Sequence, residues 1–185
     1  MAAASLLQPP ERLEGEGVRL RRSAPQDAPA MFRAAHDPEV MRYMDWPLQM
    51  AQGEAWAFLD AAPQRWRDAL EFHWMIEPAA GAEPVGCLSC RPKGHAVDLG
   101  IFLARDAWGH GWATGALKLL LAWLMQRPAV WRITASVDVD NERAAAMCER
   151  AGLRREGLMR CATVRPNLGR EPRDAWLYAL ARSDF

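Results

Sequence analysis

The sequence carries no excess of charge of either sign. Its 185 residues include 23 Lys and Arg and 23 Asp and Glu, for a formal net charge of zero. Proteins that bind nucleic acid without regard to sequence are usually basic, because contacts to phosphates dominate that affinity. The balance therefore argues against a nucleic-acid partner and favours a small molecule or a protein.

Long apolar runs are also missing. No segment reaches the about 18 uninterrupted apolar residues that a membrane helix needs, and the first residues have no basic start and soon meet Pro9 and Pro10. We therefore expect a cytoplasmic protein with no membrane partner. The length fits one domain, which we place at residues 17–182 after an N-terminal extension of residues 1–16.

Cysteines are few, and their spacing does not suit a metal. Cys87 and Cys90 form a CxxC inside an apolar run predicted as a strand, where residues three apart point to opposite faces. A zinc site would need a second pair, but Cys148 and Cys161 stand 13 positions apart. We expect no metal and reduced thiols.

Apolar periodicity and turn residues divide the chain into alternating helices and strands. The runs 72–77, 85–91 and 96–103 are separated by turns of hairpin length, which predicts an antiparallel meander. The other predicted strands are 18–22, 130–139, 153–163 and 173–181, and the predicted helices are 26–36, 39–43, 50–70 with a break near Pro63, 111–127, and one from Asp140 or Asn141 to 151.

A glycine-bearing turn joins the strand that ends near Leu103 to the amphipathic helix after Gly111. A helix start leaves backbone N–H groups without partners and carries about half a positive charge, so it can hold a phosphate or pyrophosphate. Gly109 and Gly111 would let the backbone approach such a ligand closely. The turn predicts an anion site.

A dinucleotide-binding protein is a remote alternative. Gly109, Gly111 and Thr114 approximate GxGxxG, and Asp138 stands where a ribose-binding acid would lie. However, the third glycine is missing, and the preceding strands connect by hairpins rather than by the crossovers that a doubly wound sheet requires. A Walker-type phosphate loop has still less support, because no GK[ST] follows the glycines.

Four blocks of sequence carry a specific resemblance. They are HDPEVMRYM, VDLGIFLARDAWG, the turn WGHGWA with TGAL after it, and VDVDNERAAAMCERAGLRREGLMR. In this order they resemble the GNAT superfamily of acetyl-CoA-dependent N-acetyltransferases, in particular its RimJ/RimL-like branch. The resemblance implies an α/β (α+β) fold with a mixed, twisted, mostly antiparallel sheet of about seven strands flanked by helices. It also implies a splayed cofactor cleft between the strands that end near Leu103 and Val139.

The resemblance assigns residues to the binding of acetyl-CoA. It implies that the pyrophosphate lies on the turn and that the pantetheine arm runs along the preceding strand, while Asn141 contacts the pantetheine, caps a helix, or does both. The turn residues are Trp108, Gly109, His110, Gly111, Trp112, Ala113 and Thr114, and the strand residues are Ile101, Phe102 and Leu103. Two positions depart from the family pattern, because Trp108 replaces glutamine or arginine and Gly115 stands where glutamate is frequent.

Catalytic candidates follow from the same alignment of motifs. Asp98 matches an acidic residue of relatives and is the predicted general base, acting through a water; the alternative is an exposed carboxylate or a structural ion pair. Glu71 and His73 are lesser candidates. Cys148 stands where many relatives carry a tyrosine acid, and its alternative role is core packing. Trp46 is predicted to contact the acceptor, and a backbone N–H near Phe102 or Leu103 to stabilise the oxyanion.

The predicted function is direct acetyl transfer from acetyl-CoA to a primary amine. An α-amino group titrates near 7.7–8 and a lysine near 10.4, so a protein N-terminus offers far more neutral amine at pH 7. Alternatives are a small-molecule amine (aminoglycoside, polyamine or amino acid) and a catalytically weak regulatory domain that binds acyl-CoA. The expected partners are coenzyme A and the amine acceptor, and a homodimer is left open.

Overall fold

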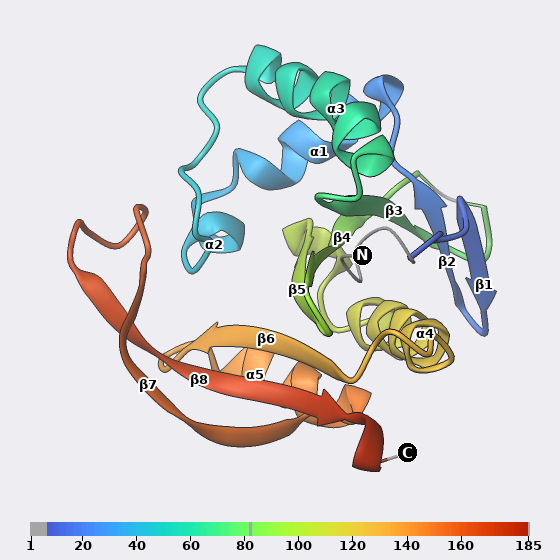
Figure 1. The fold of residues 1–185 in the computed structure, drawn as a ribbon. Helices are drawn as coiled ribbons and strands as arrows, with labels where there is room; N and C mark the ends of the chain where they lie inside the picture. The colour runs from blue at the N-terminus through green and yellow to red at the C-terminus, as the bar shows by residue number, and fades with distance from the viewer. Residues whose placement is uncertain (1–6, 82, 185) are drawn as a thin grey trace.

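One open sheet of eight strands organises the chain (Figure 1). The computed structural model describes residues 7–81 and 83–184. The strand order is β1-β2-β3-β4-β5-β6-β8-β7. The strands are β1 (Arg12–Gly15), β2 (Val18–Arg22), β3 (Phe72–Pro78), β4 (Gly86–Lys93), β5 (Ala96–Leu103), β6 (Arg132–Asp138), β7 (Arg154–Val164) and β8 (Pro172–Ala181), and the helices are α1 (Ala28–Ala35), α2 (Pro38–Met41), α3 (Gln52–Arg67), α4 (Trp112–Met125) and α5 (Glu142–Ala151).

The sheet is antiparallel except at one pair. Strands β1 to β5 pair antiparallel in sequence order, and β8 pairs antiparallel with both β6 and β7, whereas β5 and β6 are parallel. The predicted meander is confirmed. The dinucleotide-binding alternative is wrong for the same reason, because a doubly wound sheet has parallel strands joined by helical crossovers. The expected seven strands become eight because β1, within residues 1–16, pairs with β2 through Leu13 and Leu20.

The predicted break near Pro63 is wrong. Helix α3 runs through Pro63 without interruption. A proline removes one backbone hydrogen bond of the helix, but the buried side chains Ala55, Leu59 and Ala62 hold this helix against its neighbours. Tertiary packing therefore overrides the local preference. No helix in the described part of the chain is both long and apolar enough to cross a membrane.

The sheet has a helix layer on each face (Figure 1). Helix α4 packs against strands β1, β2, β3 and β5, and also against α5, while α1 and α3 cover the opposite face through β3 and β4. The main core lies under α4, with Leu117, Leu120 and Leu124 almost completely buried. Gly115 belongs to this contact, because a Cβ there would come within 3.1 Å of Val18 Cγ1. Close packing thus accounts for the glycine where relatives often have glutamate.

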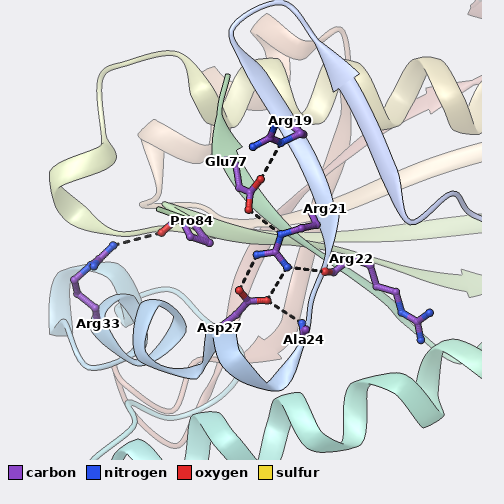
Figure 2. Close-up of polar contacts among 8 residues, drawn as sticks. All are labelled: Arg19, Arg21, Arg22, Ala24, Asp27, Arg33, Glu77 and Pro84. Atoms are coloured by element: carbon purple, nitrogen blue, oxygen red, sulfur yellow. Dashed lines mark hydrogen bonds and ion pairs between the residues drawn. The ribbon is translucent and has the colours of Figure 1, made fainter. Parts of the chain in front are cut away.

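A charged network fixes the start of α1 to the sheet (Figure 2). The Arg21 guanidinium donates to both Asp27 oxygens at 2.7 and 3.1 Å and to Glu77 Oε1 at 2.8 Å. Burial raises the pKa of Glu77, but hydrogen bonds from Arg21 and Arg19 outweigh it, so its pKa lies below the ordinary value. The network is charged at neutral pH and positions the helices on this face of the sheet.

Candidate active site

Strands β5 and β6 separate partway along their length. They pair only over Ala96–Asp98 and Arg132–Thr134. Ala104 donates its N–H to Val85, and the N–H groups of a strand alternate between its two edges. The backbone groups of Phe102, two residues before Ala104, therefore also point toward β4. The N–H and C=O groups on the other edge point toward the gap, and they belong to Leu99, Ile101 and Leu103. The predicted splayed cleft is confirmed.

A cleft of about 470 Å³ occupies this gap. Residues from both faces of the sheet line it, including Asp98, Gly100 and Ile101 of β5 and Asn141 and Cys148 next to β6. The remaining lining residues are Tyr43, Met44, Asp45, Arg91, Lys93, Leu99, Leu117, Thr134, Ala135, Ser136, Val137, Asp138, Ala144, Met147, Leu153, Met159, Ala162, Thr163, Arg165 and Leu177. The opening between the strands therefore connects the α4 and α5 face with the face that carries Asp98.

Asp98 lies in the cleft at the point where the strands part. Its Oδ1 accepts a hydrogen bond from Thr134 Oγ1 at 3.2 Å. Its Oδ2 lies 3.4 Å from Lys93 Nζ and 3.5 Å from Arg91 Nη2, and the side chain is 18% exposed. The carboxylate is thus both accessible from the cleft and part of an ion-pair cluster, so its position suits either role expected from the sequence.

The two lesser candidates lie behind Asp98, away from the cleft lining. His73 is buried, its Nε2 lies 3.3 Å from Glu71 Oε1, and its Nδ1 has no hydrogen-bond partner among the described residues. Burial raises the pKa of Glu71, but the hydrogen bond to His73 and the charges of His73, Arg91 and Arg65 outweigh it and lower the pKa below the ordinary value. Arg91 lies between Glu71 and Asp98. This pair therefore acts on the cleft only through Arg91.

The glycine turn has the backbone of an anion cradle. Gly109 and Gly111 have φ values of +82° and +79°, and nothing lies within 4 Å of where either Cβ would be. Gly111 caps α4, and its carbonyl accepts from Gly115 N at 2.9 Å. The first N–H groups of the helix, from Trp112 to Thr114, have no acceptor one turn earlier. His110 stacks on Trp112 at 4.5 Å and bonds to the Trp108 carbonyl at 3.0 Å, so the turn is ordered.

Trp108 has a structural role that its sequence position did not reveal. Its indole N–H donates to the Leu103 carbonyl at 3.1 Å, which ties the turn to the end of β5. The Arg143 guanidinium of α5 lies 4.8 Å from the Trp108 ring centroid. A cation therefore stands beside the turn although the motif position itself has none. Arg143 was not identified from the sequence. The one signal for it was that Trp108 replaces the polar residue of the family motif, which implies that a cation near the turn would have to come from another segment.

Asn141 and Cys148 both line the cleft from the side of α5. Asn141 caps α5, where its Oδ1 accepts from Ala144 N at 3.2 Å, so its capping role is confirmed and its side chain also borders the cleft. Cys148 is 2% exposed, and burial raises the pKa of its thiol to about 12. A free thiol titrates near 8.5. Cys148 is therefore a weaker acid than the thiol of coenzyme A.

One wall of the cleft comes from Tyr43, Met44 and Asp45 after α2. Trp46 follows them but does not line the cleft, because its ring packs edge-on against Phe102 at 5.6 Å. The loop between β7 and β8 holds this wall in place. Asn167 of that loop accepts from Leu48 N at 2.8 Å and donates to the Met41 and Trp46 carbonyls at 2.6 and 3.0 Å.

A buried charge cluster closes the far end of β6. Asp138 is 1% exposed and accepts from Arg173 Nε at 2.7 Å, from Arg173 Nη2 at 3.1 Å and from Asp140 N at 3.1 Å. Arg165 Nε lies 3.9 Å from Asp138 Oδ2. Burial raises the pKa of Asp138, but the hydrogen bonds and the two arginines outweigh it and lower the pKa below the ordinary value. Asp138 is therefore ionised at neutral pH.

Replacing Asp138 with asparagine is expected to destabilise the protein by about 2 kcal/mol at pH 7, since it leaves two arginines beside a neutral group. Because the native pKa of Asp138 is lowered, its stabilisation is complete above the unfolded value near 3.9 and is lost as the pH falls through the native value. The difference in unfolding free energy between Asp138→Asn and wild type should therefore shrink below about pH 4. Denaturant unfolding at pH 7 and pH 3 measures it.

The exposed neighbour Asp140 serves as the control. Its side chain also pairs with Arg173 but is 64% exposed, so Asp140→Asn should change stability by less than about 1 kcal/mol. Equal losses in the two variants would contradict the role given to Asp138.

The CxxC pair points to opposite faces of β4, as its strand position predicted. Cys87 packs with Met75 under α1 and α3, whereas Cys90 belongs to the core under α4. Burial raises the pKa of both thiols far above the ordinary value. Among residues 7–81 and 83–184, no group of three or more His, Cys, Asp or Glu side chains could hold a metal ion.

Comparison with known proteins identifies the family. Residues 18–154 match the acetyltransferase (GNAT) domain. An uncharacterized N-acetyltransferase of Bacillus subtilis (strain 168), YoaA, is 23% identical over 151 residues, which cover 80% of this chain and 85% of that protein. The family match spans strands β2 to β6, the glycine turn and the helices α4 and α5 that border the cleft.

Solved structures share the fold at low sequence identity. RimL, a ribosomal L7/L12 alpha-N-protein acetyltransferase in complex with coenzyme A, superposes with a TM-score of 0.81 at 20% identity, over 95% of this chain and 100% of that chain. RimJ of Mycobacterium smegmatis in complex with CoA-disulfide gives 0.78 at 24% identity, over 91% and 83%. A GNAT-family acetyltransferase from Bacillus anthracis gives 0.80 at 20% identity, over 93% and 99%.

Proposed function

The chain belongs to the GNAT acetyltransferase family, and we propose that this N-acetyltransferase moves the acetyl group of acetyl-CoA directly onto the α-amine of a protein N-terminus, within a domain of residues 17–182. One observation carries the proposal. Strands β5 and β6 part immediately after Asp98 and Thr134, and the strand edge so exposed leads into the Gly111 turn. A thioester-bearing arm and an anion can thus be held at one continuous site.

The residues of this site fit coenzyme A. The pyrophosphate would lie on the amides between Trp108 and Thr114, where N–H groups and the helix dipole favour an anion. The pantetheine arm would run along β5, since Ile101 turns both backbone groups to the gap, with Asn141 on the other side. The Leu103 N–H is the oxyanion donor supported by strand alternation, rather than that of Phe102. Acetyl-CoA supplies the activated acetyl group.

Asp98 is the group proposed to remove the proton from the attacking amine. It lies in the cleft on the face opposite α4, where an acceptor can approach the thioester from the other side of the sheet. The resemblance of the block around Asp98 to the family and the position of Asp98 in the cleft both support this role. A carboxylate that takes the proton through a water would then pass it to solvent.

Cys148 is proposed to pack against the arm rather than to act as an acid. The pKa of its thiol is about 12, well above that of the coenzyme A thiol. The equilibrium constant for proton transfer from Cys148 to the departing thiolate is therefore unfavourable by roughly three orders of magnitude. That thiolate leaves without such help, since its conjugate acid titrates near 8.5. Trp46 is proposed to act indirectly, through Phe102 and the wall formed by Tyr43 and Asp45.

Two considerations support a protein N-terminus as acceptor. An α-amine keeps a sizeable neutral fraction at pH 7, unlike a lysine side chain, and this site offers one carboxylate as base. The printed name of RimL describes an alpha-N-protein acetyltransferase of ribosomal L7/L12. The alternatives are a small-molecule amine and a regulatory domain that binds acyl-CoA, the latter favoured by the absence of a competent acid at Cys148.

A binding titration and a turnover assay test the proposal. Coenzyme A should bind at micromolar levels, and acetyl-CoA should release its thiol when amidated peptides with free N-termini are supplied. Binding without turnover on peptides, polyamines, amino acids and aminoglycosides would favour the regulatory domain. Turnover on small amines alone would show that the acceptor is a small molecule and not a protein N-terminus. Failure to bind coenzyme A at millimolar levels would refute the proposed coenzyme A site.

Arg143 provides a test of the cradle. Its guanidinium lies over Trp108 beside the turn, so Arg143→Ala is expected to weaken coenzyme A binding by about fivefold, the worth of one partly exposed cation near phosphate. The loss should shrink at high salt, because screening weakens exposed charge pairs. Calorimetric titration at low and high salt measures it.

Arg150, in the last turn of the same helix, is the matched control. Arg150→Ala removes the same charge from α5 at its other end and should leave the affinity for coenzyme A unchanged. A salt-independent loss at Arg143, or equal losses in both variants, would mean that the guanidinium does not act on the phosphates.

A further inference from the structure

Arg165 is a buried cation without a carboxylate partner at hydrogen-bond distance among the described residues. It begins the loop between β7 and β8, its side chain is 7% exposed, and it lines the cleft. Its Nε atom has no hydrogen-bond partner in the described part of the chain, and the nearest carboxylate oxygen, Asp138 Oδ2, is 3.9 Å away. The ion pair is thus long and not hydrogen-bonded. A buried cation without hydrogen-bonded partners is costly, so the retention of Arg165 at a cleft suggests a ligand of opposite charge.

The carboxylate beside it is already occupied. Asp138 receives two hydrogen bonds from Arg173 and one from the Asp140 amide. Burial lowers the pKa of Arg165, with the charges of Asp45 and Asp138 opposing it. An arginine nevertheless stays charged at neutral pH. Arg165 therefore presents N–H donors that neither neighbouring carboxylate binds within hydrogen-bond distance.

Arg165 lies on the acceptor side of the sheet. Along β6, Ile133 and Val137 point into the core under α4. Side chains alternate along a strand, so Asp138 shares its face with Thr134, which bonds to Asp98. The anion cradle is at the start of α4, on the other face. An anion bound to Arg165 would therefore belong to the acceptor and not to coenzyme A.

The loop that carries Arg165 is fixed. Asn167, two residues later, makes three hydrogen bonds to the backbone of the last residue of α2 and the segment after it. The Arg165 carbonyl accepts from Leu168 N at 2.8 Å and from Gly169 N at 3.0 Å, which closes a tight turn. The guanidinium is thus held in place before any ligand arrives, which lowers the entropic cost of binding.

We propose that Arg165 binds a carboxylate of the acceptor, and that the acceptor is a peptide N-terminus with an acidic side chain near its start. This inference rests on the proposed N-terminal acetyltransferase function. Thr134 bonds to Asp98, and Asp138 lies beside Arg165. Thr134 and Asp138 are four steps apart along β6, a span of about 13 Å. An extended peptide advances about 3.4 Å per residue. With its amine at Asp98, the peptide would bring its fourth or fifth side chain to Arg165, because about four steps along the peptide cover this span.

Peptide pairs that differ in one charge test the inference. Amidated peptides Ser-Ala-Ala-Asp-Ala and Ser-Ala-Ala-Asn-Ala, and the same pair with the change at position two or at position five, are assayed as acceptors with acetyl-CoA. The wild type should favour aspartate at position four or five, and not at position two, by about tenfold in kcat/KM, the worth of one charge-assisted hydrogen bond. Arg165→Gln should abolish the preference, so that the ratio of kcat/KM between the aspartate and asparagine peptides falls to about one.

Controls separate a role in recognition from a role in folding. Arg170→Gln removes a charge from the exposed part of the same loop and should keep the preference. Arg165→Lys retains a charge and tests the site if Arg165→Gln unfolds; it should keep a reduced preference. Free serine and free aspartate carry their α-carboxylate on the same carbon as the amine and should be poor acceptors. Acetylation of both in preference to the amidated peptides would make the α-carboxylate the ligand and overturn the peptide assignment.

The outcomes distinguish the two proposals. Acetylation of both peptides at equal rates by the wild type, or a preference that survives in Arg165→Gln, would overturn the inference and leave the N-terminal acetyltransferase standing. Thiol release with small amines but with no peptide of the panel would instead refute the proposed acceptor class, and the inference with it.

Discussion

Replacing Gly111 with valine should weaken the binding of coenzyme A by about a hundredfold, roughly 2.7 kcal/mol. Gly111 has φ +79° and ψ −4° as the N-cap of α4, a left-handed conformation that costs an L-residue about 1–2 kcal/mol and suits a β-branched side chain least. Valine would pull the turn out of this conformation and misalign the first N–H groups of the helix. Calorimetric titration with coenzyme A measures the loss.

Gly17 offers a matched control. It has φ +77° in the turn between β1 and β2, and like Gly111 it has nothing within 4 Å of where a Cβ would lie. Gly17→Val should therefore lose comparable stability to unfolding but bind coenzyme A as wild type does. If both variants lose affinity equally, the effect reports general destabilisation. If Gly111→Val binds normally, the anion does not lie on this turn.

Local sequence was sufficient to predict the parts of the site that lie on one continuous segment. The apolar run ending at Leu103, the two glycines and the periodic helix after Gly111 are read from neighbouring residues, and the structure has them in that arrangement. Asn141 was predicted as a cap because N-cap chemistry is local. The same holds for the meander, whose hairpin turns are short.

Local sequence was insufficient where distant segments meet. Asn167 bonds to Met41 across 126 positions, and Arg165, in the same loop, is buried beside Asp138. Nothing in the residues around either one distinguishes it from an exposed loop residue. Arg143 became a candidate only through its distance to Trp108. Pro63 shows the converse, since a strong local signal for a break was overridden by the packing of α3.

The acceptor side of the site follows from these long-range contacts. Asp98, Thr134 and Asp138 share one face of the splayed strands, while α4 and the glycine turn belong to the other. Under the proposed function, coenzyme A and the amine would therefore approach the gap from opposite sides.

Replacing Asp98 with asparagine should lower kcat/KM for the acceptor by at least about a hundredfold, the usual worth of a general base, with the affinity for coenzyme A unchanged. Asparagine keeps the shape of the side chain and can still accept from Thr134 Oγ1, but it cannot take a proton. The variant must then rely on amine that is already neutral. Its rate should fall about tenfold for each pH unit below the amine pKa of 7.7–8, with partial recovery at higher pH.

Lys93→Ala separates catalysis from ion pairing. It removes the more exposed partner of Asp98, 3.4 Å away, and leaves the carboxylate in the cleft. If Asp98 is the base, Lys93→Ala keeps most of the wild-type activity and the wild-type dependence of rate on pH. If the ion pair is what matters, the lysine variant reproduces the loss, and Asp98→Asn has a pH profile of unchanged shape at a lower rate. That second pattern would remove Asp98 from the chemistry and leave coenzyme A binding intact.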